Sequence, residues 1–218
     1  MTDDLEPHRR AAQTKRTRTR NALLDAAVLV FSEKGWSARM EDIARHAGVG
    51  AATAYKHFPT KTELMMRTFE RFMEPFQEKA EHDIAVQMNP EFAVTRHITE
   101  LCHQVQRSHK NLVAAYLTAI SETARSATGP IVVEMGGGTP VMTTLVDPGK
   151  PLADLIHYGQ EAGRFRSDES AWMVGAYHTY AILWMIVGPL PPPMGENTYA
   201  SLVLSQMLPW LKLKPGQG

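Results

Sequence analysis

Apolar residues recur every three or four positions through most of the chain, and this period constrains the fold more than any other feature. Between residues 18 and 34, just before Gly35, the pattern falls on Leu23, Leu24, Ala27, Val28 and Phe31. Such a pattern is typical of an amphipathic helix, and a glycine commonly ends one. No stretch of useful length alternates apolar and polar residues as a half-buried strand does. The sequence therefore predicts an all-α fold.

The same period predicts the remaining helices and one irregular segment. Short helices are expected over 40–47 and 51–57. A long helix is expected to begin near Thr60 and to be kinked or broken at Pro75, because proline removes a backbone donor. Residues 125–151 are rich in Gly and Pro and predict an irregular connector. Further helices are expected from Pro90 to about 105, over 111–124, 152–163 and 197–211, and over a charge-free stretch that ends near 188.

Charges are segregated along the chain although the net charge is zero. From His8 to Lys61 there are eleven Lys and Arg against four Asp and Glu, a net of +7, so the remainder carries −7. A basic N-terminal part on an acidic body is typical of a polyanion-binding module joined to a second domain. Composition alone leaves a solvated basic tail as the alternative.

The segment Met40–Phe58, MEDIARHAGVGAATAYKHF, predicts a helix-turn-helix. Ala44 is small where two helices would cross, and Gly48 stands where a sharp turn needs a positive φ. Ile43 and Ala54 are expected to face inward. The outward positions of the second helix mix small, hydroxyl and basic groups that suit the major groove: Ala51, Thr53, Tyr55, Lys56 and His57. A structural helical hairpin is the alternative.

Four segments resemble the TetR-type transcriptional regulators: FSEKGW (31–36), EDIARHAGV (41–49), TAYKHFPTKTEL (53–64) and, more weakly, YGQEAGRFR (158–166). The resemblance implies an N-terminal three-helix DNA-binding domain. It also implies a helical bundle that binds a small-molecule effector between its helices and homodimerises through its last two long helices. The expected domains are a flexible basic arm over 1–17, a helix-turn-helix domain over 18–61, an effector-binding and dimerisation domain over 62–211 and a tail over 212–218.

The resemblance assigns roles by position. Thr53 and Tyr55 resemble the base and phosphate contacts of the family, and His57 resembles its aromatic phosphate contact. Lys61 resembles the lysine that reaches a phosphate at the start of the long helix.

Two positions depart from the family pattern. Arg39 stands where a capping Ser or Thr is common, so we expect Ser37 to cap the helix and Arg39 to meet a phosphate. Gly50-Ala51-Ala52 replaces the commoner polar start of the recognition helix and removes potential hydrogen bonds to bases.

The stretch between Glu169 and Glu196 contains no Asp, Glu, Lys or Arg and is about long enough to span a bilayer. His178 and Thr179 in its middle are costly in hydrocarbon, and its flanks carry no positive charge. A buried helix is therefore favoured over a membrane helix. Two neighbouring apolar stripes imply burial on two sides, and hence a second subunit: Trp172, Ala176, Thr179, Leu183 and Val187 in one, Met173, Tyr177, Tyr180 and Trp184 in the other.

Twelve methionines suit a helical core that adapts to a ligand, although ordinary packing is the alternative for each of them. The residues expected to bind an effector are apolar or aromatic, with His178 as a polar group: Phe72, Phe76, Val105, Tyr116, Ile120, Trp172, Tyr177 and His178.

Patterns of catalytic or metal chemistry are missing from the sequence. No HExxH, CxxC or GxSxG occurs, and His97, His103 and His109 recur every six residues, which spreads them around a helix. We therefore expect no enzyme, no cofactor and no metal. Cys102 is the single cysteine, and the first residues contain no apolar stretch typical of a signal peptide, so we expect a cytoplasmic protein.

These observations predict a cytoplasmic, homodimeric transcriptional regulator, most simply a repressor, with double-stranded DNA as its partner. A largely apolar small molecule would release it from a palindromic operator, and no membrane partner is expected. The alternative is a helical ligand-binding or membrane-associated protein whose basic N-terminus binds anionic lipid.

Overall fold

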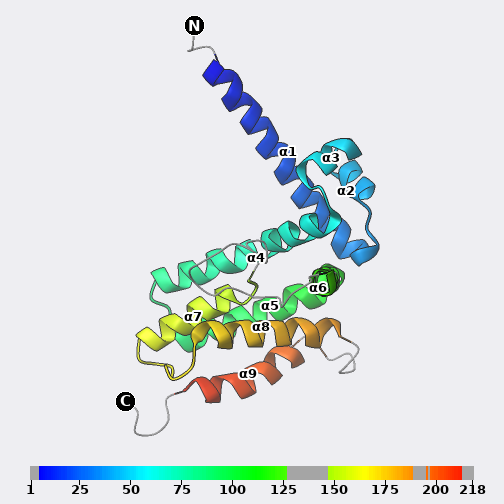
Figure 1. Ribbon diagram of the computed structural model, residues 1–218. Helices are drawn as coiled ribbons and strands as arrows, with labels where there is room; N and C mark the ends of the chain where they lie inside the picture. Colours follow the sequence, from blue (N-terminus) through cyan, green and yellow to red (C-terminus); the bar gives the residue numbers. More distant parts are fainter. Residues whose placement is uncertain (1–4, 127–146, 189–194, 196, 213–218) are drawn as a thin grey trace. The chain divides into compact units, whose positions relative to one another are not determined.

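The computed structural model describes residues 5–126, 147–188, 195 and 197–212, and their regular structure is helical (Figure 1). An isolated bridge between Phe165 and Lys212 is the exception within these ranges. The all-α prediction is confirmed. The α-helices are α1 (Leu5–Lys34), α2 (Met40–His46), α3 (Ala51–His57), α4 (Lys61–Ala85), α5 (Pro90–Gln104), α6 (Lys110–Ser126), α7 (Lys150–Glu161), α8 (Ala171–Val187) and α9 (Thr198–Leu211), with a 3-10 turn η1 (Gly35–Ser37) and a π-helical turn η2 (Val105–His109).

The chain forms two compact units, and each is built from two separate stretches of sequence. The first unit contains Met1–Phe72 and Ala114–Leu145, and the second contains Met73–Val113 and Val146–Gly218. Helices α4 and α6 therefore contribute residues to both units. This division differs from the boundary expected between residues 61 and 62, because the start of α4 and most of α6 pack with the N-terminal helices.

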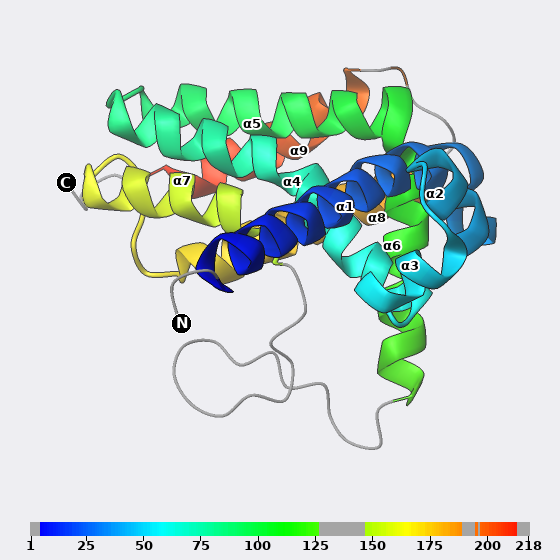
Figure 2. The same ribbon diagram turned by 90° about the horizontal axis from the view of Figure 1, so that it is seen from above.

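In the first unit, α2 packs on the C-terminal half of α1, and α3 packs on α2 (Figure 2). The side chains between these helices are apolar and buried: Leu23, Ala27, Phe31, Ile43, Ala44, Ala54 and Phe58. Phe69 of α4 stacks on Tyr116 of α6, with ring centroids 3.6 Å apart and planes 4° from parallel. Full burial of an aromatic side chain contributes about 1.5–3 kcal/mol, so this stack fixes α6 firmly to the start of α4.

Trp36, in the turn that follows α1, joins three helices of the first unit. Its indole N–H donates to Oε1 of Glu122 on α6 at 3.1 Å, and its ring is nearly parallel to that of Phe31 on α1. The ammonium of Lys61 on α4 lies 3.9 Å from the ring centroid and donates to the carbonyl of Trp36 at 2.8 Å. One side chain thus connects α1, α4 and α6.

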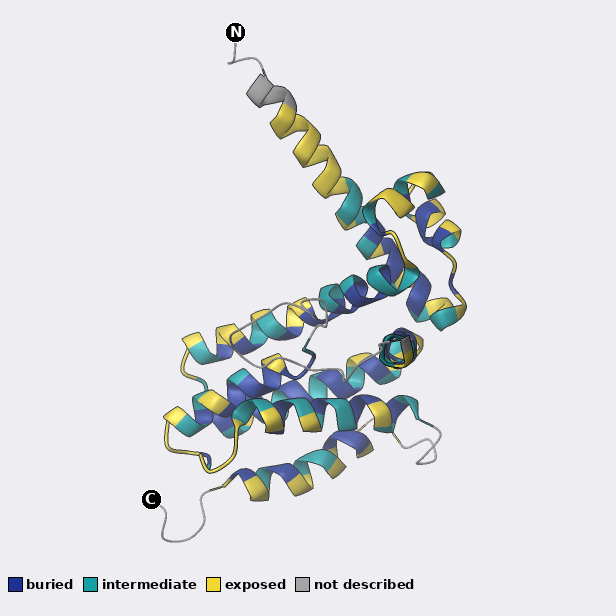
Figure 3. Cartoon of the chain, in the orientation of Figure 1, coloured by how far each residue is buried: buried dark blue, intermediate teal, exposed yellow. Residues whose placement is uncertain are grey.

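The N-terminal part of α1 corrects one expectation. Helix α1 begins at Leu5, so residues 5–17, where we expected a flexible arm, are helical. Residues 9–18 are exposed (Figure 3) and are rich in Ala, Gln, Lys and Arg, which favour a helix without packing. An exposed helix has no apolar face, and so the apolar period could not reveal it.

In the second unit, α7 packs on both α5 and α8, and α9 packs on α5 and α8. Helices α7 and α8 approach closely because glycine lies at their crossing. A Cβ added to Gly175 would lie 2.6 Å from the backbone nitrogen of Ala153, and one added to Gly149 would lie 2.4 Å from the Cα of Ala176. The backbone atoms of Ala153 and Ala176 cannot move away without disturbing their helices, so both positions need glycine.

Other helix boundaries are close to those expected. The π-helical turn after α5 leads directly into α6, where we expected two separate helices. Helix α4 passes through Pro75 without a break. Most of the expected connector 125–151 lies outside the described residues, and α7 begins at Lys150, two residues before the expected start.

Candidate nucleic-acid interface

Helices α2 and α3 form a helix-turn-helix. Gly48 in the turn has a φ of +68°, which glycine adopts without steric cost. The amide of Val49 donates to the carbonyl of Ala44 at 2.9 Å and closes the end of α2. Ala44 and Ala54 are 1% and 0% exposed, and their short side chains allow the close crossing. The turn and packing positions predicted from the sequence are confirmed.

The outward face of α3 carries the residues expected to contact DNA. Tyr55 is 45% exposed and Lys56 is also exposed, whereas Ala51, Thr53 and His57 are half-buried. All five positions keep accessible surface while Ala54 faces inward. The face can therefore meet another molecule without any rearrangement of the helix pair.

Cationic groups of α1 gather beside the end of α3. Burial lowers the pKa of His57, and the charges of Arg16, Arg20 and Lys56 lower it further. The guanidinium carbon of Arg20 lies 4.4 Å from the ring centroid of Phe58, the residue that ends α3. A positive field at this point favours phosphate. The sequence indicated a basic arm but did not single out Arg16 and Arg20, because their proximity to α3 is a tertiary contact.

The start of α2 partly corrects the expected capping. Arg39 is exposed and forms the N-cap without a side-chain hydrogen bond. The hydroxyl of Ser37, which we expected to cap α2, instead donates to the carbonyl of Lys34 at 2.6 Å and closes the turn η1. Asp42 in the first turn of α2 pairs with Lys34 at 3.2 Å and with Arg45 at 3.0 Å; the hydrogen bond from Lys34 is the main cause of its lowered pKa. Arg39 is therefore the exposed cation at the start of α2, as a phosphate contact requires.

Lys61 is held inside the first unit more than we expected. Burial lowers the pKa of its ammonium, while the charge of Glu122 opposes that shift. The ammonium already contacts the carbonyl and the ring of Trp36. A phosphate contact by Lys61 would have to use its remaining donors, and it stays a prediction.

The residues expected to bind an effector are divided between the two units. The first unit holds Phe72, Tyr116 and Ile120, and the second holds Phe76, Val105, Trp172, Tyr177 and His178. In the first unit, Phe72 and Tyr116 both contact Phe69. In the second, the ring of Phe76 meets buried His97 edge-on at 5.9 Å. Effector binding by these residues stays a prediction.

Tyr177 does not line the interior of the second unit, because it is 71% exposed on α8. A place for Tyr177 in the effector site stays a prediction. Met173 and Trp184 on the same stripe of α8 are 59% and 52% exposed, and Leu202 and Trp210 on α9 are exposed as well. We call these five residues the α8–α9 apolar face. Exposed large apolar side chains on two neighbouring helices are typical of interaction sites.

The neighbouring stripe of α8 is turned toward the core. Thr179 and Leu183 are 0% exposed in the core of the second unit. Trp172, Ala176 and Val187 of this stripe are half-buried. Burial of α8 on two sides by a second subunit stays a prediction, and the structure adds that the stripe with Trp184 is the outward one.

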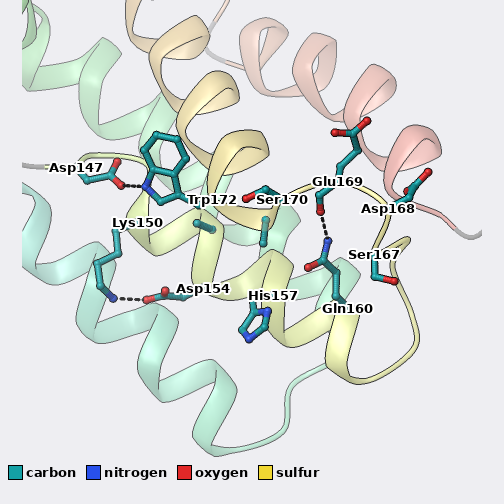
Figure 4. Close-up of a pocket in the computed structure, with 12 residues that line it drawn as sticks. Asp147, Lys150, Asp154, His157, Gln160, Ser167, Asp168, Glu169, Ser170 and Trp172 are labelled. Atoms are coloured by element: carbon teal, nitrogen blue, oxygen red, sulfur yellow. Dashed lines mark hydrogen bonds and ion pairs between the residues drawn. The ribbon is translucent and has the colours of Figure 1, made fainter. Parts of the chain in front are cut away.

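A surface pocket of about 700 Å³ lies between α7 and the start of α8 (Figure 4). Its side chains are largely polar and interact with one another. Lys150 forms an ion pair with Asp154 at 2.5 Å, and the indole N–H of Trp172 donates to Asp147 at 2.5 Å. Of the eight expected effector-binding residues, Trp172 lines this pocket. A pocket with this lining differs from the apolar one that we expected.

Within the described ranges, no helix combines the length and the apolar character needed to cross a membrane, and the charge-free helix α8 has 17 residues.

Comparisons with known proteins agree with this geometry. Residues 23–67 match the family described as bacterial regulatory proteins, tetR family. The HTH-type transcriptional regulator CymR of Pseudomonas putida is 35% identical over 88 residues, which cover 40% of this chain and 43% of that protein. The HTH-type transcriptional repressor LfrR of Mycolicibacterium smegmatis is 46% identical over 50 residues, 23% of this chain and 26% of that protein. The chain thus matches less than half the length of these two relatives.

Solved structures extend the likeness to nearly the whole chain. FadR of Thermus thermophilus, a TetR-family repressor in complex with lauroyl-CoA, has a TM-score of 0.61 and 16% identity over 91% of this chain and 98% of that one. RolR in complex with resorcinol has a TM-score of 0.61 and 17% identity over 88% of this chain and 89% of that one. At this identity the likeness shows the fold alone.

A helix-turn-helix unit and a second, helical unit are together the architecture of helix-turn-helix regulators. Within that class, residues 23–67 match the tetR family of bacterial regulatory proteins, and the resemblance expected from the sequence is confirmed.

Proposed function

We propose that this chain is a homodimeric, ligand-responsive transcriptional regulator that represses genes next to a roughly palindromic operator. The observation that carries the proposal is the outward face of α3, where exposed Tyr55 and Lys56 lie beside the cations of α1 and around a buried Ala54. Such a helix enters the major groove and contacts bases and phosphates together. The repressor LfrR among the relatives supports the sign of regulation.

The α8–α9 apolar face supports the proposed dimerisation. A twofold axis would bring the outward stripe of α8 and the exposed side chains of α9 onto their counterparts in a second copy and form a four-helix bundle. Two recognition helices would then meet half-sites about 34 Å apart. A function in transcription places the protein with the DNA, in the cytoplasm.

The effector is proposed to be a largely apolar small molecule that binds among buried aromatic side chains. Resorcinol and lauroyl-CoA are bound by two proteins of the same fold, and each contains an apolar portion. Binding would change the separation of the two recognition helices, so that both half-sites lose phosphate contacts together. Trp172 and His178 remain proposed members of the effector site. No catalytic role is proposed, and nothing observed favours the lipid-binding alternative.

Tyr55→Ala tests the DNA-binding part of the proposal. The probe is double-stranded DNA selected from a random library by the wild-type protein, and binding is measured by fluorescence anisotropy with competitor DNA present. We expect affinity for the selected sequence to fall at least about fivefold, since one lost base or phosphate contact costs about 1–3 kcal/mol.

Leu29→Ala is the matched control, because Leu29 is 58% exposed on α1 and lies on the opposite side of that helix from Arg20. It should bind as the wild type does, and both variants should remain folded and dimeric. A wild-type protein that selects no sequence from the library, or a Tyr55→Ala variant that binds normally, would overturn the proposal.

A further inference from the structure

Residues 9–20 of α1 carry six cations, and residues 9–18 are exposed. In chain order these are Arg9, Arg10, Lys15, Arg16, Arg18 and Arg20. Exposed positive charges in such number require either a solvated role or a polyanionic partner, and their arrangement around the helix separates these two possibilities.

The helical register gathers three of the six on one side. At 3.6 residues per turn each residue advances by about 100°, so Arg9, Arg16 and Arg20 lie within about 40° of one another around α1. Lys15 and Arg18 lie roughly 100° or more away from this group, toward the opposite side. The three arginines therefore form a row along one line of the helix.

This row lies on the side of α1 that meets α3. The guanidinium of Arg20 covers the ring of Phe58 directly after α3, with its carbon 4.4 Å from the ring centroid. Arg16 and Arg20 are also close enough to His57 to influence its protonation. The row thus starts at the end of the recognition helix and runs from there toward the N-terminus of α1.

We propose that Arg9, Arg16 and Arg20 form a phosphate-binding strip that continues the DNA surface of α3 along the sugar-phosphate backbone. The inference rests on the proposed function. With a rise of 1.5 Å per residue, Arg9 and Arg16 lie about 10 Å apart along α1, which exceeds the 3.4 Å of duplex axis that each phosphate of one strand occupies. Consecutive guanidinium groups can therefore meet different phosphates of the same strand.

The test compares two double variants with the same loss of charge. Arg9→Ala with Arg16→Ala removes two members of the strip, and Lys15→Ala with Arg18→Ala removes two cations from the other side of the helix. Alanine favours the helix, so neither pair should unfold α1. Binding to the selected operator is measured over a range of salt concentrations.

We expect the strip variant to flatten the log-log salt dependence by about 1.8 units, since each lost phosphate contact on duplex DNA removes about 0.9. The control pair should leave the slope within about 0.5 units of the wild type, because long-range charge alone is screened. Equal loss in both pairs would overturn the strip while leaving the proposed function intact. A wild-type protein that binds no DNA would instead refute the proposed function.

Gln13→Pro tests whether the helix itself is needed. Proline at this position clashes with the carbonyl of Arg9 and unwinds the preceding turn without removing any charge. We expect the slope to fall by about 0.9 units as Arg9 leaves the row. An unchanged slope would show that the arm acts as an unstructured polycation and would overturn the strip.

Vesicles of phosphatidylcholine with and without phosphatidylserine provide the last arm of the experiment. Wild-type protein should not bind either kind. Binding to the anionic vesicles that is lost in the strip variant, together with an unchanged salt slope on DNA, would assign the row to a lipid surface and refute the proposal.

Discussion

Replacing Trp184 by glutamate should separate the dimer, and the size of the effect follows from its exposure. The side chain is 52% exposed in the single chain. With roughly 250 Å² for a large aromatic side chain, about 130 Å² can be buried against a second copy. At about 25 cal/mol per Å² this contributes about 3 kcal/mol for each protomer, and about 6 kcal/mol for the two copies in a twofold interface.

Such a loss is large compared with the net free energy of association of two subunits. Association costs an estimated 4–15 kcal/mol of lost freedom and ordering, so only a small surplus of the gross burial energy remains as affinity. A glutamate at this position also brings two uncompensated charges to the interface. We therefore expect the dimer dissociation constant of Trp184→Glu to rise at least about a thousandfold, which corresponds to about 4 kcal/mol.

Sedimentation velocity over a wide range of protein concentration measures this directly. Wild type should sediment as a species of about twice 24.3 kDa, and Trp184→Glu as a monomer with much weakened operator binding. Phe92→Glu is the matched control, because Phe92 is 58% exposed on α5, in the same unit but off the α8–α9 apolar face. A wild-type monomer, or a Trp184→Glu variant that dimerises normally, would refute the reasoning.

Two further predictions concern single buried or half-buried groups. Burial, with a smaller effect from Lys79, lowers the pKa of His97 to about 4 from its ordinary 6.5. Between about pH 6.5 and pH 4 the unfolded state therefore binds a proton that the folded state does not bind. The free energy of unfolding should fall by about 3 kcal/mol as the pH drops through this range. Urea unfolding across this range should show that loss in wild type but not in His97→Leu, and equal pH dependence in both would assign it to other groups. Lys61→Met should lower the free energy of unfolding by about 1–2 kcal/mol through lost contacts with Trp36, and should flatten the salt slope of DNA binding by about 0.9 through a lost phosphate contact. An unchanged slope would show that Lys61 stabilises the fold and binds no phosphate.

The helix-turn-helix could be predicted from sequence because its requirements are local. Gly48 needs its positive φ, and Ala44 and Ala54 need to be small at the crossing, so residue types at fixed spacing specify the motif. The helical start of α1 could not be predicted in the same way. Residues 9–18 are exposed, so their helix rests on intrinsic propensity, which leaves no periodic pattern.

The direction in which α8 faces was also beyond the sequence. Both of its stripes are apolar, and only the packing of α7 and α9 decides that Leu183 points inward while Trp184 points outward. A charge at Leu183, which the sequence alone suggests as a probe of the interface, would instead be buried in the core of the second unit. Effector-binding residues were harder still to predict from the sequence, because aromatic side chains pack equally well in a core and against a ligand.

The interleaving of the two units limits how this chain can be divided. Each unit is completed only by a second, distant stretch of sequence, as when Tyr116 closes on Phe69. A ribosome must therefore finish well over half of the chain before the DNA-binding unit can bury its full core. For the same reason, a chimera that exchanges the N-terminal part at a single junction would leave behind half of the aromatic stack. A functional exchange of DNA-binding specificity needs the α6 stretch to move together with the recognition helix, or a substitution limited to the outward face of α3.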